Sequence, residues 1–268
     1  MFEDSRPFIE TDALKPFVHT DEDSVSMQFD MAIIQSRMRL DDPTALDLQY
    51  TRVMMGFAVI NPAPASLLMI GLGGGSLAKY CYKHFPHMDI TVVEINPHVI
   101  AMRDAFMVPP DGDRFRVVCA DGAEFMAQQA KGAAYELIMV DGFSYEGQPE
   151  GLCSIAFYKT CRAALSESGI LAVNMSDQEP ECSRLMGRIW QVFGEGVVAL
   201  DVECGGNRIA MASTEDVLRD CAANFGRRCA ALSPDLQATL STTTAGLEYE
   251  LSPWRAAKAV KAKPKRAR

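Results

Sequence analysis

SLLMIGLGGGSLAKYCYKHFP, residues 66–86, begins as an apolar run, meets three glycines at alternate positions and then becomes amphipathic. A buried strand that enters a helix through a glycine-rich turn is typical of ligand-binding α/β folds. Gly71, Gly73 and Gly75 carry no side chains, so a ligand can lie against the backbone there. The spacing GxGxG lacks the last glycine of the dinucleotide pattern GxGxxG, and it is not the GxxxxGK[ST] of a P-loop. The spacing therefore excludes a P-loop, and a nucleoside remains a possible ligand of this turn.

Strand and helix patterns alternate after this turn. Because each apolar run is followed by an amphipathic stretch, the alternation predicts an α/β fold with a doubly wound, largely parallel sheet. Two late runs joined through Gly-Gly predict an antiparallel edge pair. The expected strands are 66–72, 89–96, 115–121, 135–143 and 169–176, with the edge pair at 197–203 and 206–213, and the expected helices are 75–85, 97–106, 122–130, 154–165 and 183–193.

The regions before and after this alternating part have different patterns. Residues 25–30 alternate between polar and apolar and predict a strand, with residues 32–40 as its hairpin partner. Residues 40–60 predict one helix, with Asp41 or Asp42 as its cap. Two more helical stretches and a basic tail follow. We therefore expect a small N-terminal β-hairpin segment over 1–45, a nucleoside-binding domain with C-terminal helices over 46–250, and a disordered basic tail over 251–268.

Composition limits the classes of partner. The chain has 268 residues and a net charge of −9, from 26 basic and 35 acidic residues. Seven of the basic residues follow Pro253, where no acid occurs, so the rest carries 19 basic and 35 acidic residues, or −16. An acidic body argues against a nucleic-acid-binding core. No run approaches the roughly 20 apolar residues of a membrane span. Eight scattered cysteines without CxxC predict reduced thiols, no metal site and a cytoplasmic protein.

Carboxylates follow three of the expected strands. Glu94, Asp121 and Asp141 each stand at or just after the end of an apolar run. Ligands of doubly wound sheets bind at that edge, so we expect the three carboxylates to surround the glycine turn. Glu94 lies 19 residues after Gly75, the usual offset of a carboxylate that binds a ribose diol. Asp121 is also well placed to cap the helix that follows it.

The charge around the turn indicates the kind of ligand. Glu94 disfavours a 2′-phosphate, and Lys79 is the one basic residue near the turn, which makes a pyrophosphate a poor fit. A ligand with a ribose, an adenine and a cationic centre suits an acidic mouth better. This description fits an S-adenosyl nucleoside.

The sequence resembles the spermidine synthase family, and most closely its bacterial spermidine synthase-like members. The resemblance implies a fold of the class I methyltransferase type with a small N-terminal β segment. It also implies aminopropyl transfer from decarboxylated S-adenosylmethionine to a polyamine or other amine acceptor, no prosthetic group and no metal, and a homodimer. The stretches that carry it, within residues 33–175, are IIQSRM, LDLQYTRVMM, LLMIGLGGGSLAK, VVEINPHVI, CADGAEF, IMVDGF and LCSIAFYKTCRAAL.

The resemblance assigns roles to individual positions. Glu94 would hold the ribose hydroxyls beside the glycine turn, and Asp121 with Gly122 would meet the adenine. Asp141 would face the amine. Gln35 and Tyr50 match positions that line the donor and acceptor pockets, although a hairpin amide and a core aromatic are equally good interpretations of these two residues. We therefore expect Asp141 and Tyr50 to be catalytic and Gln35 to belong with the nucleoside-binding residues.

Two positions depart from the family pattern. Gly74 stands where the family has an aspartate in the glycine turn, and Ser144 replaces the second carboxylate after the fourth strand. A serine hydroxyl is not a base near neutral pH without help, so Asp141, Glu146 or Glu150 would have to replace it. We expect slow transfer. We also expect poor discrimination between S-adenosylmethionine and its decarboxylated form, or a preference for the carboxylated one, because Gly74 supplies no charge and free backbone N–H groups at a helix N-terminus favour an anion.

Three functions stay open at this point. The first is an aminopropyltransferase. The second is an S-adenosylmethionine-dependent methyltransferase acting on a small or protein substrate. The third is a non-catalytic nucleoside-binding member of the family. Fold class alone does not choose among them.

Overall fold

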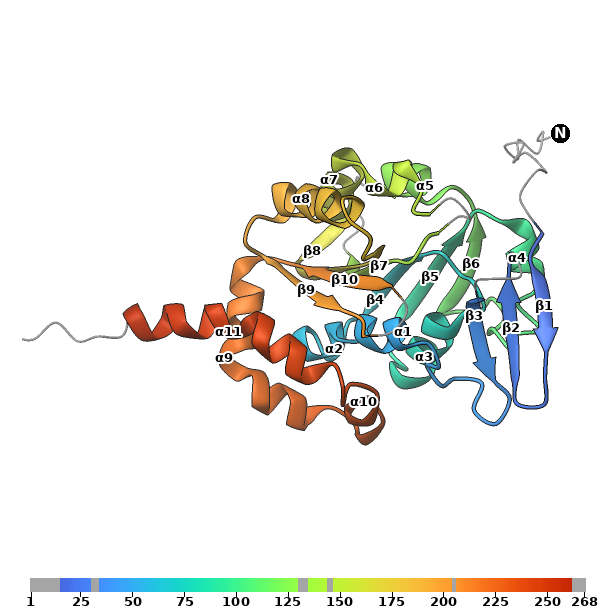
Figure 1. Cartoon of the computed structure of the whole chain (residues 1–268), viewed down its shortest axis with the longest axis horizontal. Helices are drawn as coiled ribbons and strands as arrows, with labels where there is room; N and C mark the ends of the chain where they lie inside the picture. The colour runs from blue at the N-terminus through green and yellow to red at the C-terminus, as the bar shows by residue number, and fades with distance from the viewer. Residues whose placement is uncertain (1–14, 30–33, 130–134, 144–146, 204–205, 262–268) are drawn as a thin grey trace, which may run out of the picture.

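The computed structural model describes residues 15–29, 34–129, 135–143, 147–203 and 206–261, with side chains up to Trp254. Two sheets and their covering helices make up this part of the chain (Figure 1). In it, no helix combines the length and hydrophobicity needed to cross a bilayer.

A seven-stranded sheet forms the centre of the molecule, in the order β6-β5-β4-β7-β8-β10-β9. The first five of these strands in that order are parallel, and β10 runs antiparallel to both β8 and β9. The chain moves outward from β4 to β6 and then returns to the other side of β4, so the switch point lies between β4 and β7. The predicted fold class and the antiparallel edge pair are confirmed. The strands are β4 (Ser66–Ile70), β5 (Asp89–Glu94), β6 (Phe115–Cys119), β7 (Tyr135–Val140), β8 (Leu165–Ser176), β9 (Val197–Asp201) and β10 (Asn207–Ala212).

Helices cover both faces of this sheet (Figure 1), and one hydrophobic core lies on each face. Leu67 and Met69 of β4 point into one core, and Leu68 and Ile70 point into the other, because successive strand residues face opposite sides. The first core is closed by α1 (Gln49–Met54), α2 (Phe57–Ile60), α3 (Ser76–His84), α4 (Pro97–Ala101), α9 (Glu215–Ala231), α10 (Pro234–Thr239) and α11 (Thr244–Lys261), and the second by α5 (Gly122–Gln129), α6 (Glu150–Cys153), α7 (Ile155–Ala164) and α8 (Glu181–Phe193).

The N-terminal segment forms an antiparallel sheet of three strands, β1 (Phe17–Thr20), β2 (Ser24–Gln28) and β3 (Ile34–Arg39). The predicted hairpin is β2 with β3. The strand β1 was not expected, because its residues FVHT carry no alternating pattern, and in the structure all four are exposed. Met27 pairs with Ser36 and Gln28 with Ile34, so Gln35 is the extra residue of a β-bulge.

The helix expected over 40–60 begins later than predicted, at Gln49, and is divided into α1 and α2. Asp42 does not cap a helix: it accepts hydrogen bonds from the backbone N–H and hydroxyl of Thr44. Arg52 donates to the carbonyls of Leu46 and Asp47 and so holds the connection against α1. A turn stabilised by an arginine five and six residues further along the chain thus replaces the first two expected helical turns.

The C-terminal region contains three helices rather than the two expected, and α11 runs through the predicted boundary at residue 251 to Lys261. Leu251 is fully buried and Trp254 packs against the first core. Helix, rather than the expected disordered tail, therefore occupies residues 251–261. Residues 262–268 lie outside the described part, and the division of the chain into domains stays a prediction.

Replacing Trp254 by alanine should lower the free energy of unfolding by about 1–2 kcal/mol, because a partly buried apolar surface is lost. For a chain of this size the melting temperature should fall by several degrees. Tyr249→Ala is the matched control on the same helix, since Tyr249 is 76% exposed and its loss should leave the melting temperature unchanged. Equal melting temperatures for the two variants would mean that α11 ends its contact with the body before Trp254.

Candidate active site

The glycine turn connects β4 to α3 in a conformation that requires glycine at two positions. Gly71 has φ +95°, and a Cβ there would lie 2.2 Å from the carbonyl oxygen of Asp141. Gly75 caps α3 with φ +68°, and a Cβ there would lie 2.5 Å from Val108. Side chains at either position would force the loops apart, so the turn stays close to the ends of β4 and β7.

Glu94, at the end of β5, braces the glycine turn. Its Oε2 accepts the backbone N–H of Leu72 at 2.8 Å, and its Oε1 accepts that of Asn96 at 2.8 Å. The residue is only 8% exposed. Burial raises the pKa of Glu94, and the backbone hydrogen bonds oppose that rise. The backbone N–H groups of Gly73 and Ile95 also act on this carboxylate, so the backbone uses much of its acceptor capacity, and its role towards a ribose diol stays a prediction.

Asp121 and Gly122 begin α5 at the same edge of the sheet. The Oδ1 atom of Asp121 accepts the backbone N–H groups of Ala123 at 2.8 Å and Glu124 at 2.9 Å, which is an N-cap. A Cβ on Gly122 would lie 2.5 Å from Ile70, so the start of α5 packs tightly on the end of β4. The capping role is therefore present, and the role towards adenine stays a prediction.

Asp141, just after β7, is the centre of a polar network. Its Oδ2 accepts the hydroxyl of Tyr50 at 3.2 Å, and its Oδ1 accepts the side-chain amide of Asn174 at 2.8 Å. The carbonyl oxygen of that amide in turn accepts from Asn207 at 3.0 Å. This second contact fixes which end of the Asn174 amide faces Asp141.

The same network sets the protonation of its members. Burial raises the pKa of Asp141, while hydrogen bonds from Asn174 and Tyr50 oppose the rise. Burial and the charge of Asp141 raise the pKa of Tyr50 well above 10, so its hydroxyl stays protonated and donates. The carboxylate at the switch point is therefore a stronger base than an exposed aspartate.

The structure brings some of the predicted residues together and not others. Tyr50 contacts Asp141 from α1, across 91 positions of sequence. Gln35 lies in the bulge of β3, and it is the next residue, Ser36, that contacts the glycine turn. Ser144 and Glu146 lie outside the described residues, and Glu150 is exposed at the start of α6.

Asn174 is the site residue that the sequence analysis missed. It is 2% exposed and lies near the end of β8, beside the end of β7. Asn174 follows the apolar run ILAV as Glu94 and Asp141 follow theirs, but with an amide in place of a carboxylate. Asn174 therefore belongs with the residues that position Asp141.

Lys79 does not face the mouth of the site. It is 3% exposed, and its Nζ donates to the carbonyl of Phe106 at 2.7 Å. Burial lowers the pKa of Lys79 to about 8. The contact ties the segment around Phe106 and Val108 to α3, and both of these side chains press on the glycine turn.

Lys79 should make stability depend on pH. Its pKa is about 8 in the folded protein against an ordinary 10.5, so between these values the unfolded chain binds more protons. The contribution of Lys79 to the free energy of unfolding therefore rises with pH across this window, because the cost of burying its charge is relieved, and the difference between wild type and a Lys79 variant isolates it from the buried thiols. Lys79→Met should remove that rise in urea titrations from pH 7 to 10.5. Lys83→Met, on the exposed side of the same helix, should retain it, and parallel curves for wild type and Lys79→Met would contradict the prediction.

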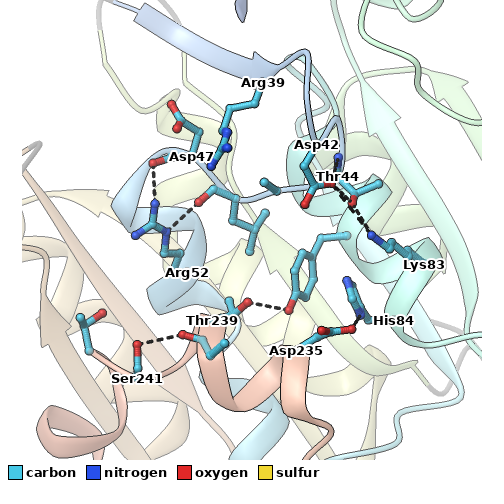
Figure 2. Close-up of a pocket in the computed structure, with 15 residues that line it drawn as sticks. Arg39, Asp42, Thr44, Asp47, Arg52, Lys83, His84, Asp235, Thr239 and Ser241 are labelled. Carbon is cyan, nitrogen blue, oxygen red and sulfur yellow. Dashed lines mark hydrogen bonds and ion pairs between the residues drawn. The ribbon is translucent and has the colours of Figure 1, made fainter. Parts of the chain in front are cut away.

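A cavity of about 350 Å³ lies at the other end of α3 (Figure 2). Figure 2 shows charged side chains of both signs around it, with Lys83 bonded to Thr44 and His84 beside Asp235. Lys83 and His84 end α3, whereas the glycine turn precedes its first residue. The residues that line the cavity include neither the turn glycines nor Glu94, Asp121 and Asp141. It is therefore separate from the carboxylates at the strand ends.

The chain is similar to known proteins in both sequence and structure. The model of the spermine/spermidine synthase domain matches residues 47–191. A polyamine aminopropyltransferase of Neisseria meningitidis is 38% identical over 181 residues, which are 67% of this chain and 68% of that protein. One of Chromobacterium violaceum is 37% identical over 188 residues, 70% and 71% of the two chains. The crystal structure of a probable spermidine synthase from Corynebacterium glutamicum has the same fold, with a TM-score of 0.62 at 17% identity over 81% of this chain and 84% of that one. The chain belongs to the spermine/spermidine synthase family.

Proposed function

We propose that the protein transfers an aminopropyl group from decarboxylated S-adenosylmethionine to a polyamine or a related amine. The observation that carries the proposal is the carboxylate of Asp141 at the switch point, held between Tyr50 and Asn174. Relatives at 37–38% identity are named polyamine aminopropyltransferases, which favours aminopropyl over methyl transfer. The net charge of −9 also suits a polycationic acceptor.

The chemistry assigns a role to each end of the site. A protonated amine is not a nucleophile, so it must lose one proton, and Asp141 is the acceptor that we propose. The amine nitrogen then forms a bond to the carbon beside the sulfonium. The carbon–sulfur bond breaks, and its electron pair returns to sulfur, leaving a neutral thioether nucleoside. Glu94 would hold the ribose during this in-line exchange, and Tyr50 would keep Asp141 oriented.

The test uses the full chain and two labelled donors. Decarboxylated S-adenosylmethionine labelled in the aminopropyl group is incubated with a panel of diamines and polyamines, and S-adenosylmethionine labelled in the methyl group is run in parallel. We expect label from the first donor in a longer polyamine. Label transferred only from the methyl donor would favour a methyltransferase, and binding without transfer from either would favour a non-catalytic member.

A homodimer is part of this proposal. It is supported by β1, an edge strand whose residues are all exposed and include Phe17 at 54% and Val18 at 38%. Exposed edge strands with apolar side chains are sites where chains pair. Light scattering on the purified protein should give twice the mass of one chain. A single-chain mass at micromolar concentration would rule the dimer out.

A cytoplasmic location is also proposed. Among the described residues, Cys81, Cys119, Cys153, Cys161, Cys182 and Cys229 are free thiols, and four of these six are buried. Free thiols persist in reducing compartments. Cell fractionation should find the protein with soluble enzymes of the cytoplasm.

A further inference from the structure

Position 74 of the glycine turn is closed by neighbouring side chains. A Cβ on Gly74 would lie 2.6 Å from the Oγ of Ser36 and 2.7 Å from the ring of Phe106. Gly74, unlike Gly73 and Gly75, does not have a positive φ, so packing and not backbone conformation excludes a side chain here. Ser36 is 6% exposed and Phe106 is fully buried, which leaves little space to accommodate one.

Ser36 is held over the turn by the N-terminal sheet. It pairs with Met27 of β2, and the bulge at Gln35 directly precedes it. Ser36 and Met38 point inward from β3, as expected for alternate residues of a strand. The Cβ of Ser36 would also contact a Cβ on Gly73, at 3.7 Å. The hydroxyl of Ser36 thus occupies the space that a side chain from position 74 would take.

The placement of this hydroxyl bears on the tail of the nucleoside. The glycine turn lies between Glu94, which contacts Leu72, and Asp141, which contacts Gly71. A nucleoside with its ribose at Glu94 and its reacting carbon towards Asp141 carries its tail past the turn, beside Ser36. A carboxylate at this point would attract an ammonium tail and repel a carboxylated one. A neutral hydroxyl can accept a hydrogen bond from the ammonium and donate one to the carboxylate.

We propose that Ser36 is a specificity-determining residue: its neutral hydroxyl binds the tail of the nucleoside and admits both S-adenosylmethionine and its decarboxylated form. The inference rests on the proposed function, because it takes the glycine turn as the nucleoside site. The wild-type affinities for the two nucleosides should therefore differ by less than a hundredfold.

The first test removes the hydroxyl. Ser36→Ala should weaken binding of S-adenosylmethionine about tenfold in calorimetry, because a hydrogen bond to a charged group is lost. It should leave 5′-methylthioadenosine unaffected, since that nucleoside lacks the charged tail. Ser26→Ala, a buried serine of the same sheet in β2, is the control and should change neither affinity. Equal weakening of both nucleosides by Ser36→Ala, or no weakening at all, would overturn the proposal.

The second test adds a charge. Ser36→Asp should shift the affinity ratio at least tenfold towards the decarboxylated nucleoside, relative to Ser36→Asn, which has the same size and no charge. Equal ratios in the two variants would also overturn the proposal. Wild-type protein that binds none of these nucleosides would instead refute the proposed function, so the two failures are distinguishable.

Discussion

Asp141→Asn should abolish aminopropyl transfer and leave the fold intact. The variant removes the base and the anionic anchor for the amine, and general-base groups contribute about 10²- to 10⁴-fold to rate. Asparagine can present its carbonyl to Asn174 and its amide to the hydroxyl of Tyr50, so the contacts of the network persist with one donor reversed. Transfer of label from the aminopropyl donor, measured with saturating amine, should fall by at least a hundredfold.

The stability of this variant separates a chemical role from a structural one. The folded pKa of Asp141 is raised by burial, so above that pKa the folded protein bears the cost of a buried charge that the unfolded chain avoids. A neutral asparagine removes this cost, and the melting temperature at pH 7 should be equal or higher. Asp42→Asn, an exposed carboxylate at the distant cavity, controls for the loss of one negative charge and should retain activity. Full activity of Asp141→Asn would place the base elsewhere.

Glu94→Ala should cost about 1.5–3 kcal/mol of nucleoside affinity, or roughly 10- to 150-fold, because charge-assisted hydrogen bonds to the ribose are lost. The variant also leaves the backbone N–H groups of Leu72 and Asn96 without their acceptors. The glycine turn should therefore loosen, and the melting temperature should fall together with the affinity. Calorimetry with S-adenosylmethionine and thermal unfolding measure the two effects separately.

Glu94→Gln is the informative companion to this variant. Both carboxylate oxygens accept backbone N–H groups, so glutamine can satisfy one of them and must turn an NH₂ group towards the other. Its affinity should lie between those of wild type and Glu94→Ala. An unchanged affinity in both variants, with a lowered melting temperature, would show that Glu94 braces the turn without touching the nucleoside.

The sequence predicted the sheet because its signals are local. Each central strand is a short apolar run bounded by polar residues or glycine, and strand and helix alternate through most of the chain. The elements that were wrong depend on side-chain contacts that hydrophobic patterns and capping signals do not reveal. Asp42 carries the sequence signature of a helix cap, but Arg52 stabilises a loop there instead. The residues after 251 are rich in basic side chains, which is typical of a disordered tail. Leu251 nevertheless belongs to the first core, and Trp254 packs against it.

The site was predictable to the extent that strand ends reveal it. Glu94 and Asp141 follow apolar runs, and parallel strands bring such ends to one edge. Tyr50, which the family resemblance assigned to the donor and acceptor pockets, donates a hydrogen bond to Asp141. The contact of Ser36 with the glycine turn could not be read from the sequence, because a bulge changes the phase of a strand by one residue without altering its composition. The nucleoside-binding role of Gln35 stays a prediction.

The packing of β3 on the glycine turn also constrains how this protein can change by mutation. An acidic side chain introduced at position 74 meets Ser36 and Phe106 before it can meet a ligand, so that single substitution is expected to be harmful whatever charge it brings. The same substitution becomes tolerable only after residues 36 and 106 have become smaller. The order of these substitutions therefore matters. Residues 36 and 74 are almost 40 positions apart, yet each limits which substitutions the other tolerates. A lineage that has closed position 74 in this way can most readily regain an acid near the turn from the N-terminal sheet.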